Sequence, residues 1–291
     1  MTDMSPMTIV AESGASKTDW MVGGRRIRTK GINFSVMSRE DISSVVSCVA
    51  NEVVDGISGD QGIFIYFYGA GLVTDTHKEE MTDILRKFFH GASVECSSDL
   101  LAAARALWGD SPGIVAILGT GSNSCSYDGT RITANVRPGG YILGDEGGGA
   151  ALGRRFLADY IKNLTPGTLS ERFREQYRLD YADIVNSVYK SPNPAGFLAS
   201  FAPFIIEAAG KDGYCRSLVT ENVRAFITRS LLSYRQGNEI LEVGVAGSVG
   251  MACSRWLESI GKDYNVNFRK FMSSPVEALA GYHMDKNSGI L

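Results

Sequence analysis

Residues 113–127 read Gly-Ile-Val-Ala-Ile-Leu-Gly-Thr-Gly-Ser-Asn-Ser-Cys-Ser-Tyr, an apolar run followed by a glycine-rich turn and a second segment. The apolar run is typical of a buried strand, and the turn exposes backbone amides because glycine has no Cβ. An expected hairpin at Asp128-Gly129 leads to a third strand over 131–136. The stretch therefore predicts three consecutive strands with a glycine-rich turn between the first two.

The same order occurs near the amino end of the chain. There we expect strands at 7–12, 18–23 and 25–30, with the turn Ser13-Gly14-Ala15-Ser16 after the first. Further helices are expected at 38–55, 77–90, 98–108, 148–162, 248–260 and 275–285, and strands at 62–68, 92–96, 240–246 and 266–272. The duplication predicts an α/β protein of two lobes, each βββαβαβα, with a cleft between them.

The turn signal Asp110-Ser111-Pro112-Gly113 predicts the boundary between the lobes. We expect a first lobe over 1–112 and a second over 113–274, with the final helix, 275–291, packing back on the first. Residues 163–239 are mostly helical by pattern and are punctuated by prolines. This segment is expected to be a helical insertion that shapes a substrate pocket or a dimer contact.

Composition excludes several classes of protein. A net charge of −3 without a long basic run argues against nucleic-acid binding. Five cysteines without a C-x-x-C pair predict reduced thiols in a cytoplasmic protein, and none of the three histidines is at metal-ligand spacing from another. We expect no signal peptide and no membrane-spanning segment.

Both glycine-rich turns predict phosphate binding. In the first, the amides of Ser13, Gly14, Ala15 and Ser16 are expected to approach a phosphate, and Lys17 adds a positive charge. Glu12 ends the preceding strand, where a carboxylate can hold Mg²⁺ through water.

The second turn consists of Gly119, Thr120, Gly121 and Ser122, and its hydroxyls and amides suit a γ-phosphate. Because the two turns occupy equivalent places in the repeats, they predict one two-sided clamp for the phosphates of ATP.

Three further elements carry candidate chemistry. The loop from Gly139 to Gly149 contains Asp145 and Glu146, which could hydrogen-bond sugar hydroxyls. Asp99 ends the last strand of the first lobe, where a general base could accept a proton from a substrate hydroxyl. The segment Val243–Gly250 ends a strand in small residues and opens a helix, against which adenosine could lie.

Together these motifs resemble the acetate and sugar kinase/Hsp70/actin superfamily. Within it, the chain resembles the BadF/BadG/BcrA/BcrD ATPase family, specifically its N-acetylglucosamine kinase-like members, over nearly its whole length. The matching motifs are Glu12-Ser13-Gly14-Ala15-Ser16-Lys17-Thr18-Asp19-Trp20, Leu118-Gly119-Thr120-Gly121-Ser122-Asn123, Gly144-Asp145-Glu146-Gly147 and Gly244-Val245-Ala246-Gly247-Ser248.

The resemblance implies two actin-like ATPase lobes related to ribonuclease H, and it implies roles for residues. Asp99 would be the base, Thr120 would contact the γ-phosphate, and Gly244, Gly247 and Ser248 would lie near adenosine. The sugar would contact Asn33, Asn123, Gly139, Gly140, Asp145 and Glu146. The chain departs from the family at Glu12, where Asp is usual, at Pro138-Gly139-Gly140, where the human enzyme has a tryptophan that packs on the sugar, and at Gly148, where Ser is frequent.

These observations predict a kinase that transfers the γ-phosphoryl group of Mg²⁺–ATP to an amino sugar such as N-acetylglucosamine, glucosamine or N-acetylmuramic acid. The family suggests a homodimer. Two alternatives are an ATPase that activates a dehydratase or reductase through an iron–sulfur cluster, and a non-catalytic sugar sensor. A fold alone does not decide among them.

Overall fold

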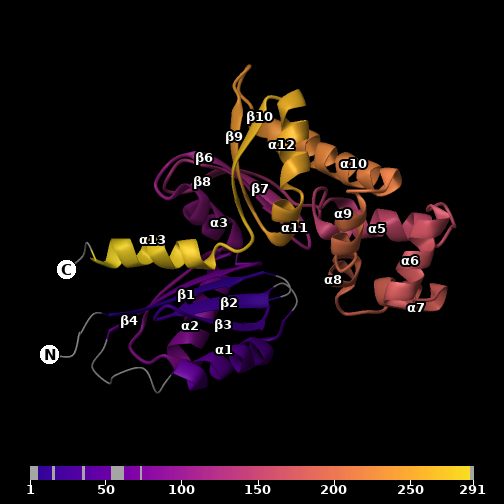
Figure 1. The fold of residues 1–291 in the computed structure, drawn as a ribbon. Coiled ribbons are helices and arrows are strands. Elements are labelled where there is room, and N and C mark those ends of the chain that lie inside the picture. The colour runs from indigo at the N-terminus through magenta and orange to yellow at the C-terminus, as the bar shows by residue number, and fades with distance from the viewer. Residues whose placement is uncertain (1–5, 15–16, 35–36, 54–61, 73, 289–291) are drawn as a thin grey trace. The chain divides into compact units, whose positions relative to one another are not determined.

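A computed structural model describes residues 6–14, 17–34, 37–53, 62–72 and 74–288. The chain forms two compact units. Unit 1 comprises residues up to 110 together with those from 274 onward, and unit 2 comprises residues 111–273. Each unit contains one five-stranded mixed sheet, and each follows the predicted strand–helix order (Figure 1).

The sheet of unit 1 has the order β3-β2-β1-β4-β5. Its strands are β1 (Met7–Ser13), β2 (Lys17–Val22), β3 (Arg25–Lys30), β4 (Ile63–Gly69) and β5 (Ser93–Ser98). β1, β4 and β5 run parallel, with Ser13 beside Gly69 and Gly69 beside Ser98. β2 is antiparallel to both β1 and β3, so β3 ends at the same edge. The segments that follow four strands therefore meet at one edge of the sheet.

Two pairs of helices cover the sheet of unit 1. α1 (Arg39–Val53) and α2 (Asp75–Phe88) pack with Ile9 and Ala11 in one apolar cluster. α3 (Asp99–Trp108) and α13 (Val276–Ser288) pack with Val10 and Tyr68 on the other face, as Figure 1 shows for α13. Side chains of β1 alternate between these clusters because successive residues of a strand point to opposite faces.

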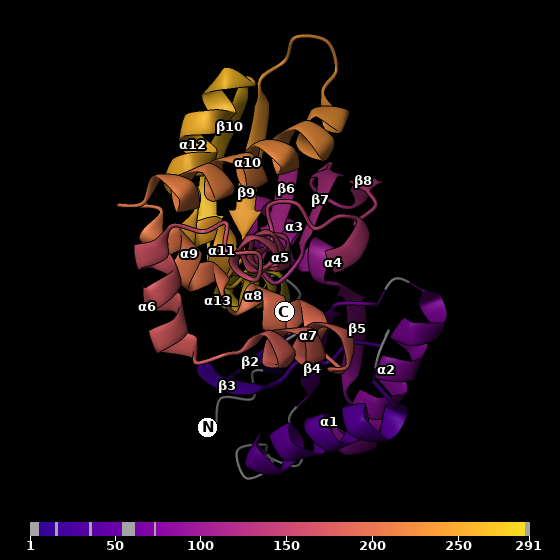
Figure 2. The ribbon, with the colours of Figure 1, turned by 90° about the vertical axis from the view of Figure 1, so that its right-hand side faces the viewer.

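Unit 2 repeats the topology with the order β10-β9-β6-β7-β8. The strands are β6 (Gly113–Leu118), β7 (Ser122–Tyr127), β8 (Ile132–Val136), β9 (Leu241–Ala246) and β10 (Val266–Met272), seen from another side in Figure 2. α4 (Gly140–Leu143) and α5 (Gly149–Tyr160) follow β8. The carboxyl ends of β6 and β9 lie side by side, because these neighbouring strands are parallel.

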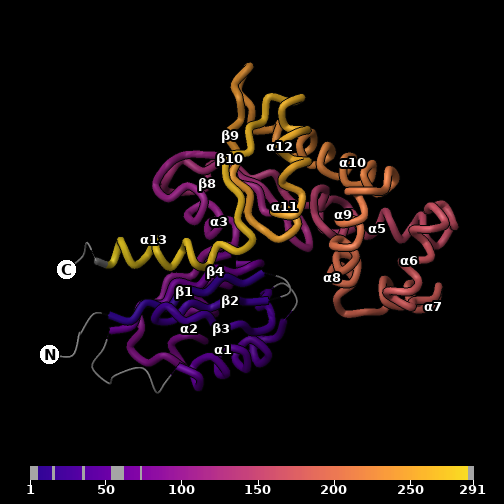
Figure 3. The backbone as a smooth tube through the Cα atoms, viewed as in Figure 1, coloured from indigo at the N-terminus to yellow at the C-terminus, as the bar shows by residue number. Residues whose placement is uncertain are grey.

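The region 163–239 is helical, as the sequence predicts, and Figure 3 shows it as one group of helices. It contains α6 (Gly167–Tyr177), α7 (Tyr181–Tyr189), α8 (Pro194–Ala199), α9 (Ala202–Ala208), α10 (Gly213–Arg229) and the short 3-10 helix η2 (Leu231–Tyr234). Stacked and edge-on rings, among them Phe156 of α5 and Phe173 of α6, join the insertion to the rest of unit 2.

The structure differs from the expected single helix at 248–260. That segment forms α11 (Ser248–Ala252) and α12 (Ser254–Asp263), with Cys253 between them. The buried Cys253 has φ −93° and ψ 7°, which lies outside the α region and interrupts the helix. The short helix α4 was also not predicted, because its four residues are too few to show a helical pattern in the sequence.

All five cysteines are free, and four of them are buried; only Cys48 is exposed. None of the helices in the part of the chain that the structure describes is long and apolar enough to span a membrane.

His283 holds α13 against the sheet of unit 1. Its ring stacks on Tyr66 with centroids 3.5 Å apart, and its Nε2 lies 2.8 Å from the hydroxyl of Tyr68. Arg105 donates to that same hydroxyl at 2.5 Å, so the Tyr68 proton is available to Nε2. Burial, together with the charges of Arg105 and Lys286, lowers the pKa of His283 to about 3.

We predict that acid weakens unit 1 through this histidine. In the unfolded chain the imidazole binds a proton near its ordinary pKa of 6.5, whereas in the folded chain it does so only near 3. The stabilisation is therefore complete above pH 6.5 and is lost as the pH falls toward 3, by about 2 kcal/mol between pH 7.5 and 5.

Denaturant unfolding of wild type and His283→Gln across this range measures the effect. The free energy of unfolding should fall less steeply in His283→Gln. Equal slopes in the two proteins would show that His283 does not carry the effect.

Candidate functional site

Predicted site residues of unit 1 gather at the edge where β1, β3, β4 and β5 end. Glu12 is the penultimate residue of β1, and Asp99 follows β5 as the first residue of α3. Asn33 lies in the segment after β3. Phe34, beside it, stacks on His77 of α2 with centroids 5.5 Å apart. The fold thus brings an amide, two carboxylates and an aromatic pair to one edge.

The charge of Asp99 acts on Glu12. Burial raises the pKa of Glu12 to about 7, and the charges of Asp99 and Asp19 add to this effect. Burial also raises the pKa of Asp99, although its Oδ1 accepts the Leu100 amide at 2.9 Å. A cation at this edge would favour the ionised form of both groups.

Asp19 of β2 is a fully buried carboxylate with three cationic partners. Lys17 Nζ lies at 2.9 Å, Arg26 Nη2 at 2.6 Å and Arg28 Nε at 2.7 Å from its oxygens. Burial acts to raise the pKa of Asp19, but the hydrogen bonds from Arg26, Arg28 and Lys17 hold it well below its usual range. Arg26 and Arg28 of β3 therefore neutralise a buried charge on the neighbouring strand.

The first turn is held from within by Ser13. Its buried Oγ lies 2.6 Å from Thr18 Oγ1, accepts the Ile32 amide at 2.8 Å and donates to the Ile32 carbonyl at 3.0 Å. The Gly14 amide donates to the Lys17 carbonyl. The Ser13 hydroxyl thus positions the segment that contains Asn33, and any phosphate contact from Ser13 would come from its backbone. Ala15 and Ser16 lie outside the described residues.

The second turn rests on the first amides of α5. Gly149 N and Ala150 N donate to the carbonyls of Gly119 and Thr120, both at 2.8 Å. In a trans peptide the N–H points opposite to the C=O. The N–H groups of Thr120 and Gly121 therefore point away from α5.

Three glycines allow the backbones of unit 2 to approach closely. A Cβ on Gly148 would lie 2.6 Å from the carbonyl carbon of Gly121, and one on Gly121 would lie 2.7 Å from the Asp145 carboxylate. Gly247 has φ +111°, and a Cβ there would lie 2.3 Å from the Leu118 carbonyl oxygen. The turn, the loop before α5 and the start of α11 are consequently packed together.

Asp145 connects the predicted sugar loop with the second turn. It has φ +60°, and its buried Oδ1 accepts the Ser122 amide at 3.2 Å. Burial raises the pKa of Asp145, while the Ser122 amide opposes this. Glu146 pairs with Arg229 of α10, and the Asn123 side chain accepts from the Ser124 amide. The structure thus brings Asp145 to the phosphate turn.

Asn222 of α10 is a member of the site that sequence reasoning missed. Its Oδ1 accepts the Gly147 amide at 2.9 Å, and its Nδ2 donates to the Gly148 carbonyl at 3.2 Å. Only the fold reveals this contact, because an asparagine in the helical insertion, 75 residues away in sequence, carries no motif.

The remaining predicted site residues of unit 2 lie in or beside α4, at the start of α11 and in β9. Gly139 packs on Gly144, and Gly140 begins α4, whose carbonyls at Tyr141 and Ile142 accept from Arg154 at 2.6 and 2.7 Å. Ser248 begins α11, next to Gly247. Gly244, in contrast, is buried inside β9 rather than at its carboxyl end, so the structure does not bring it to the other candidate residues.

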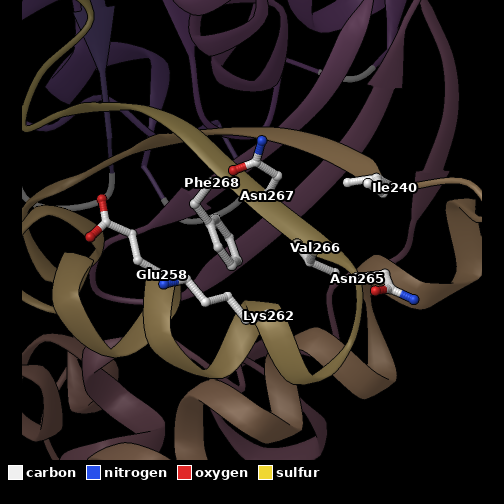
Figure 4. A pocket seen from close by; sticks show the side chains of 7 residues that line it. All are labelled: Ile240, Glu258, Lys262, Asn265, Val266, Asn267 and Phe268. Carbon is white, nitrogen blue, oxygen red and sulfur yellow. The ribbon is translucent and has the colours of Figure 1, made fainter.

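Two pockets of unit 2 differ in their relation to this site. The pocket in Figure 4, about 450 Å³, lies where β9 and β10 begin, between α12 residues such as Glu258 and Lys262 and Phe268 of β10. This pocket therefore lies at the amino ends of β9 and β10, whereas the candidate site residues follow the carboxyl ends of the strands. A second pocket, about 430 Å³, is lined by Glu146, Arg154 and Asn222 and lies beside the predicted sugar loop.

Among the described residues, no three His, Cys, Asp or Glu side chains are grouped so that they could hold a metal ion by themselves. Mg²⁺ at nucleotide sites usually keeps several waters and takes one or two carboxylates plus phosphate oxygens. Glu12 is a carboxylate close enough to Asp99 for the charge of Asp99 to raise the Glu12 pKa. This arrangement fits the way in which one or two carboxylates hold a hydrated Mg²⁺ at nucleotide sites.

Solved structures resemble the whole chain. A putative N-acetylglucosamine kinase from Porphyromonas gingivalis is 38% identical, with a TM-score of 0.87 over 96% of this chain and 99% of that one. A second such protein, from Chromobacterium violaceum, is 16% identical, with a TM-score of 0.69 over 94% and 98%. A ROK family glucokinase from Streptomyces griseus, in complex with glucose and AMPPNP, is 16% identical, with a TM-score of 0.56 over 95% and 97%.

Neither a protein-family model nor a curated protein matches the sequence. The similar structures confirm the predicted fold class, an actin-like ATPase fold with two βββαβαβα lobes.

We predict that Gly148→Ala destabilises unit 2, because the new methyl group would force apart two backbone segments. The expected loss is about 3 kcal/mol in the free energy of unfolding. Gly119→Ala is the matched control, since a Cβ there meets nothing within 4 Å, and its effect should stay within about 1 kcal/mol. Thermal melting of both variants makes the comparison; equal losses would contradict the close approach.

Proposed function

This chain belongs to the N-acetylglucosamine kinase-like family, and we propose that it transfers the γ-phosphoryl group of ATP to a hydroxyl of an amino sugar. The observation that carries the proposal is 38% identity to a putative N-acetylglucosamine kinase over 96% of the chain. The glycine-rich turns, the acidic loop and the two carboxylates described above supply the chemistry that such a reaction needs.

The second turn is the proposed binding element for the γ-phosphate. Because α5 takes up the carbonyls of Gly119 and Thr120, the amides of Thr120 and Gly121 are directed away from the helix. Amides held in place before the reaction stabilise developing negative charge without having to reorient. Asp145 and Asn222 support this turn and the loop behind it. Gly247 and Ser248 are proposed to lie against adenosine.

Mg²⁺, when bound, would offset the negative charge of the phosphates. Glu12 is the residue that we propose to hold its water shell. Its side chain is one methylene longer than the aspartate usual in the family, so it reaches further from β1. Lys17, on the other side of the first turn, is proposed to contact a phosphate.

Asp99 is the proposed general base. It lies at the carboxyl end of β5, in the same unit as Asn33, which is proposed to bind the sugar. Burial raises its pKa, which strengthens its affinity for the proton of a sugar hydroxyl. The amide hydrogen bond from Leu100 fixes one of its oxygens.

We predict that Asp99→Asn abolishes sugar-dependent turnover but not nucleotide binding. Loss of a general base lowers kcat by about 100-fold or more. ADP release measures turnover, and calorimetry measures ADP binding. Asp83→Asn, an exposed carboxylate on α2, is the control and should match wild type. If Asp99→Asn turns over normally, another residue is the base.

The sugar itself is tested with a panel containing N-acetylglucosamine, glucosamine, N-acetylmuramic acid and glucose. We expect ADP release to be fastest with one of the three amino sugars. Binding of sugar and ATP without turnover would instead indicate a sensor. Iron–sulfur absorbance in anaerobically purified protein would indicate an activator of a dehydratase or reductase. Cytoplasmic location and a homodimer remain proposals.

A further inference from the structure

Asp19 and Glu12 are direct neighbours across the antiparallel pair β1–β2. Residues paired in this way present their side chains on the same face of a sheet. Arg26 and Arg28 of β3 bind Asp19 and therefore lie on that face as well. One end of the face thus carries two carboxylates and several cations, although only Asp19 is in contact with the cations.

The cations differ in their relation to Glu12. The charges of Lys17 and Arg26 act on Glu12 and lower its pKa, against the stronger effect of burial. Arg26 is the less exposed of the two arginines that contact Asp19, with 31% of its side chain exposed against 58% for Arg28. Arg26 is thus a partly buried guanidinium that contacts Asp19 and whose charge acts on Glu12.

Arg26 is held in place by three groups. Its Nη2 contacts Asp19 at 2.6 Å, and its Nη1 contacts Glu277 of α13 at 2.6 Å. Ser274, where the chain re-enters unit 1, accepts from Arg26 Nη2 at 3.4 Å and donates to Asp19 at the same distance. Asp19 is the only one of these carboxylates that is fully buried.

We propose that Asp19 is a positioning residue that keeps the guanidinium of Arg26 off the carboxylate of Glu12, so that Glu12 stays available to a hydrated Mg²⁺. The inference rests on the proposed function. A partly buried cation that loses one of its partners turns toward another anion within reach, because an uncompensated charge is costly there. Arg26 keeps its contact with Glu277, and the other anion on which its charge acts is Glu12, the cross-strand neighbour of Asp19.

The test measures the Mg²⁺ concentration that half-saturates ADP release at saturating ATP and sugar. Asp19→Asn should raise it about 10-fold or more, as expected when the support of a metal ligand is lost. Asp19→Asn combined with Arg26→Gln should bring it back to within about threefold of wild type, since the competing cation is gone. A crystal structure of Asp19→Asn should show Arg26 paired with Glu12.

Arg28→Gln is the matched control. It removes a cation that binds Asp19 but is more exposed to solvent than Arg26, so the Mg²⁺ requirement should stay within about threefold of wild type. A normal Mg²⁺ requirement in Asp19→Asn would overturn the proposal. So would a defect that Arg26→Gln does not relieve, because a merely structural role predicts that the second change adds to the first.

If Asp19→Asn alone does not fold, the double variant carries the test. A Mg²⁺ requirement close to that of wild type then supports the proposal, and a 10-fold rise, the size expected for lost support, overturns it. Failure of the proposed function has a different signature, because wild type itself would then show no Mg²⁺-dependent, sugar-dependent ADP release.

Discussion

The close approach of two backbone segments, the turn at Gly119–Ser122 and the loop at Gly144–Gly149, is the constraint on which unit 2 depends. No side chain fits between Gly121 and Gly148. This contact lets the first amides of α5 take up the carbonyls of the turn, which in turn sets the direction of the turn's own amides. Asp145 and Asn222 complete the arrangement from either side. The proposed phosphate-binding surface, which is made of backbone, thus depends on the absence of Cβ atoms behind it.

Unit 1 has the same topology but stabilises its turn differently. Side-chain hydrogen bonds of Ser13 and Thr18 replace the glycine contacts, and the buried Asp19 gathers Lys17, Arg26 and Arg28. The close approach of two backbone segments at glycines is rigid and does not depend on ionic strength. A cluster of charges acts over a longer distance, and one substitution can change which of its charged groups pair. The duplicated fold therefore holds its two proposed phosphate elements by different forces.

Element order, the duplicated sheets and both turns could be predicted, because strand runs and glycine-rich turns are local patterns. The sequence prediction was less successful for features that depend on contacts between residues far apart in the chain. Asn222 is far from its partners in sequence, and the Ser13 hydroxyl turns inward to Ile32, 19 residues further along the chain. The partners of Asp19 come from three segments, so no motif shows that it is buried. The roles proposed for the site residues stay predictions.

The docking of α13 has a consequence for the order in which the protein becomes structured during synthesis. One face of the first sheet, with Val10 and Tyr68, is covered by Leu279 and Ala280 of α13, and that helix follows the whole of unit 2 in sequence. A ribosome therefore releases the first sheet long before its cover exists. Until α13 emerges, the part of this apolar face that Leu279 and Ala280 cover stays exposed, and transiently exposed apolar surface favours aggregation.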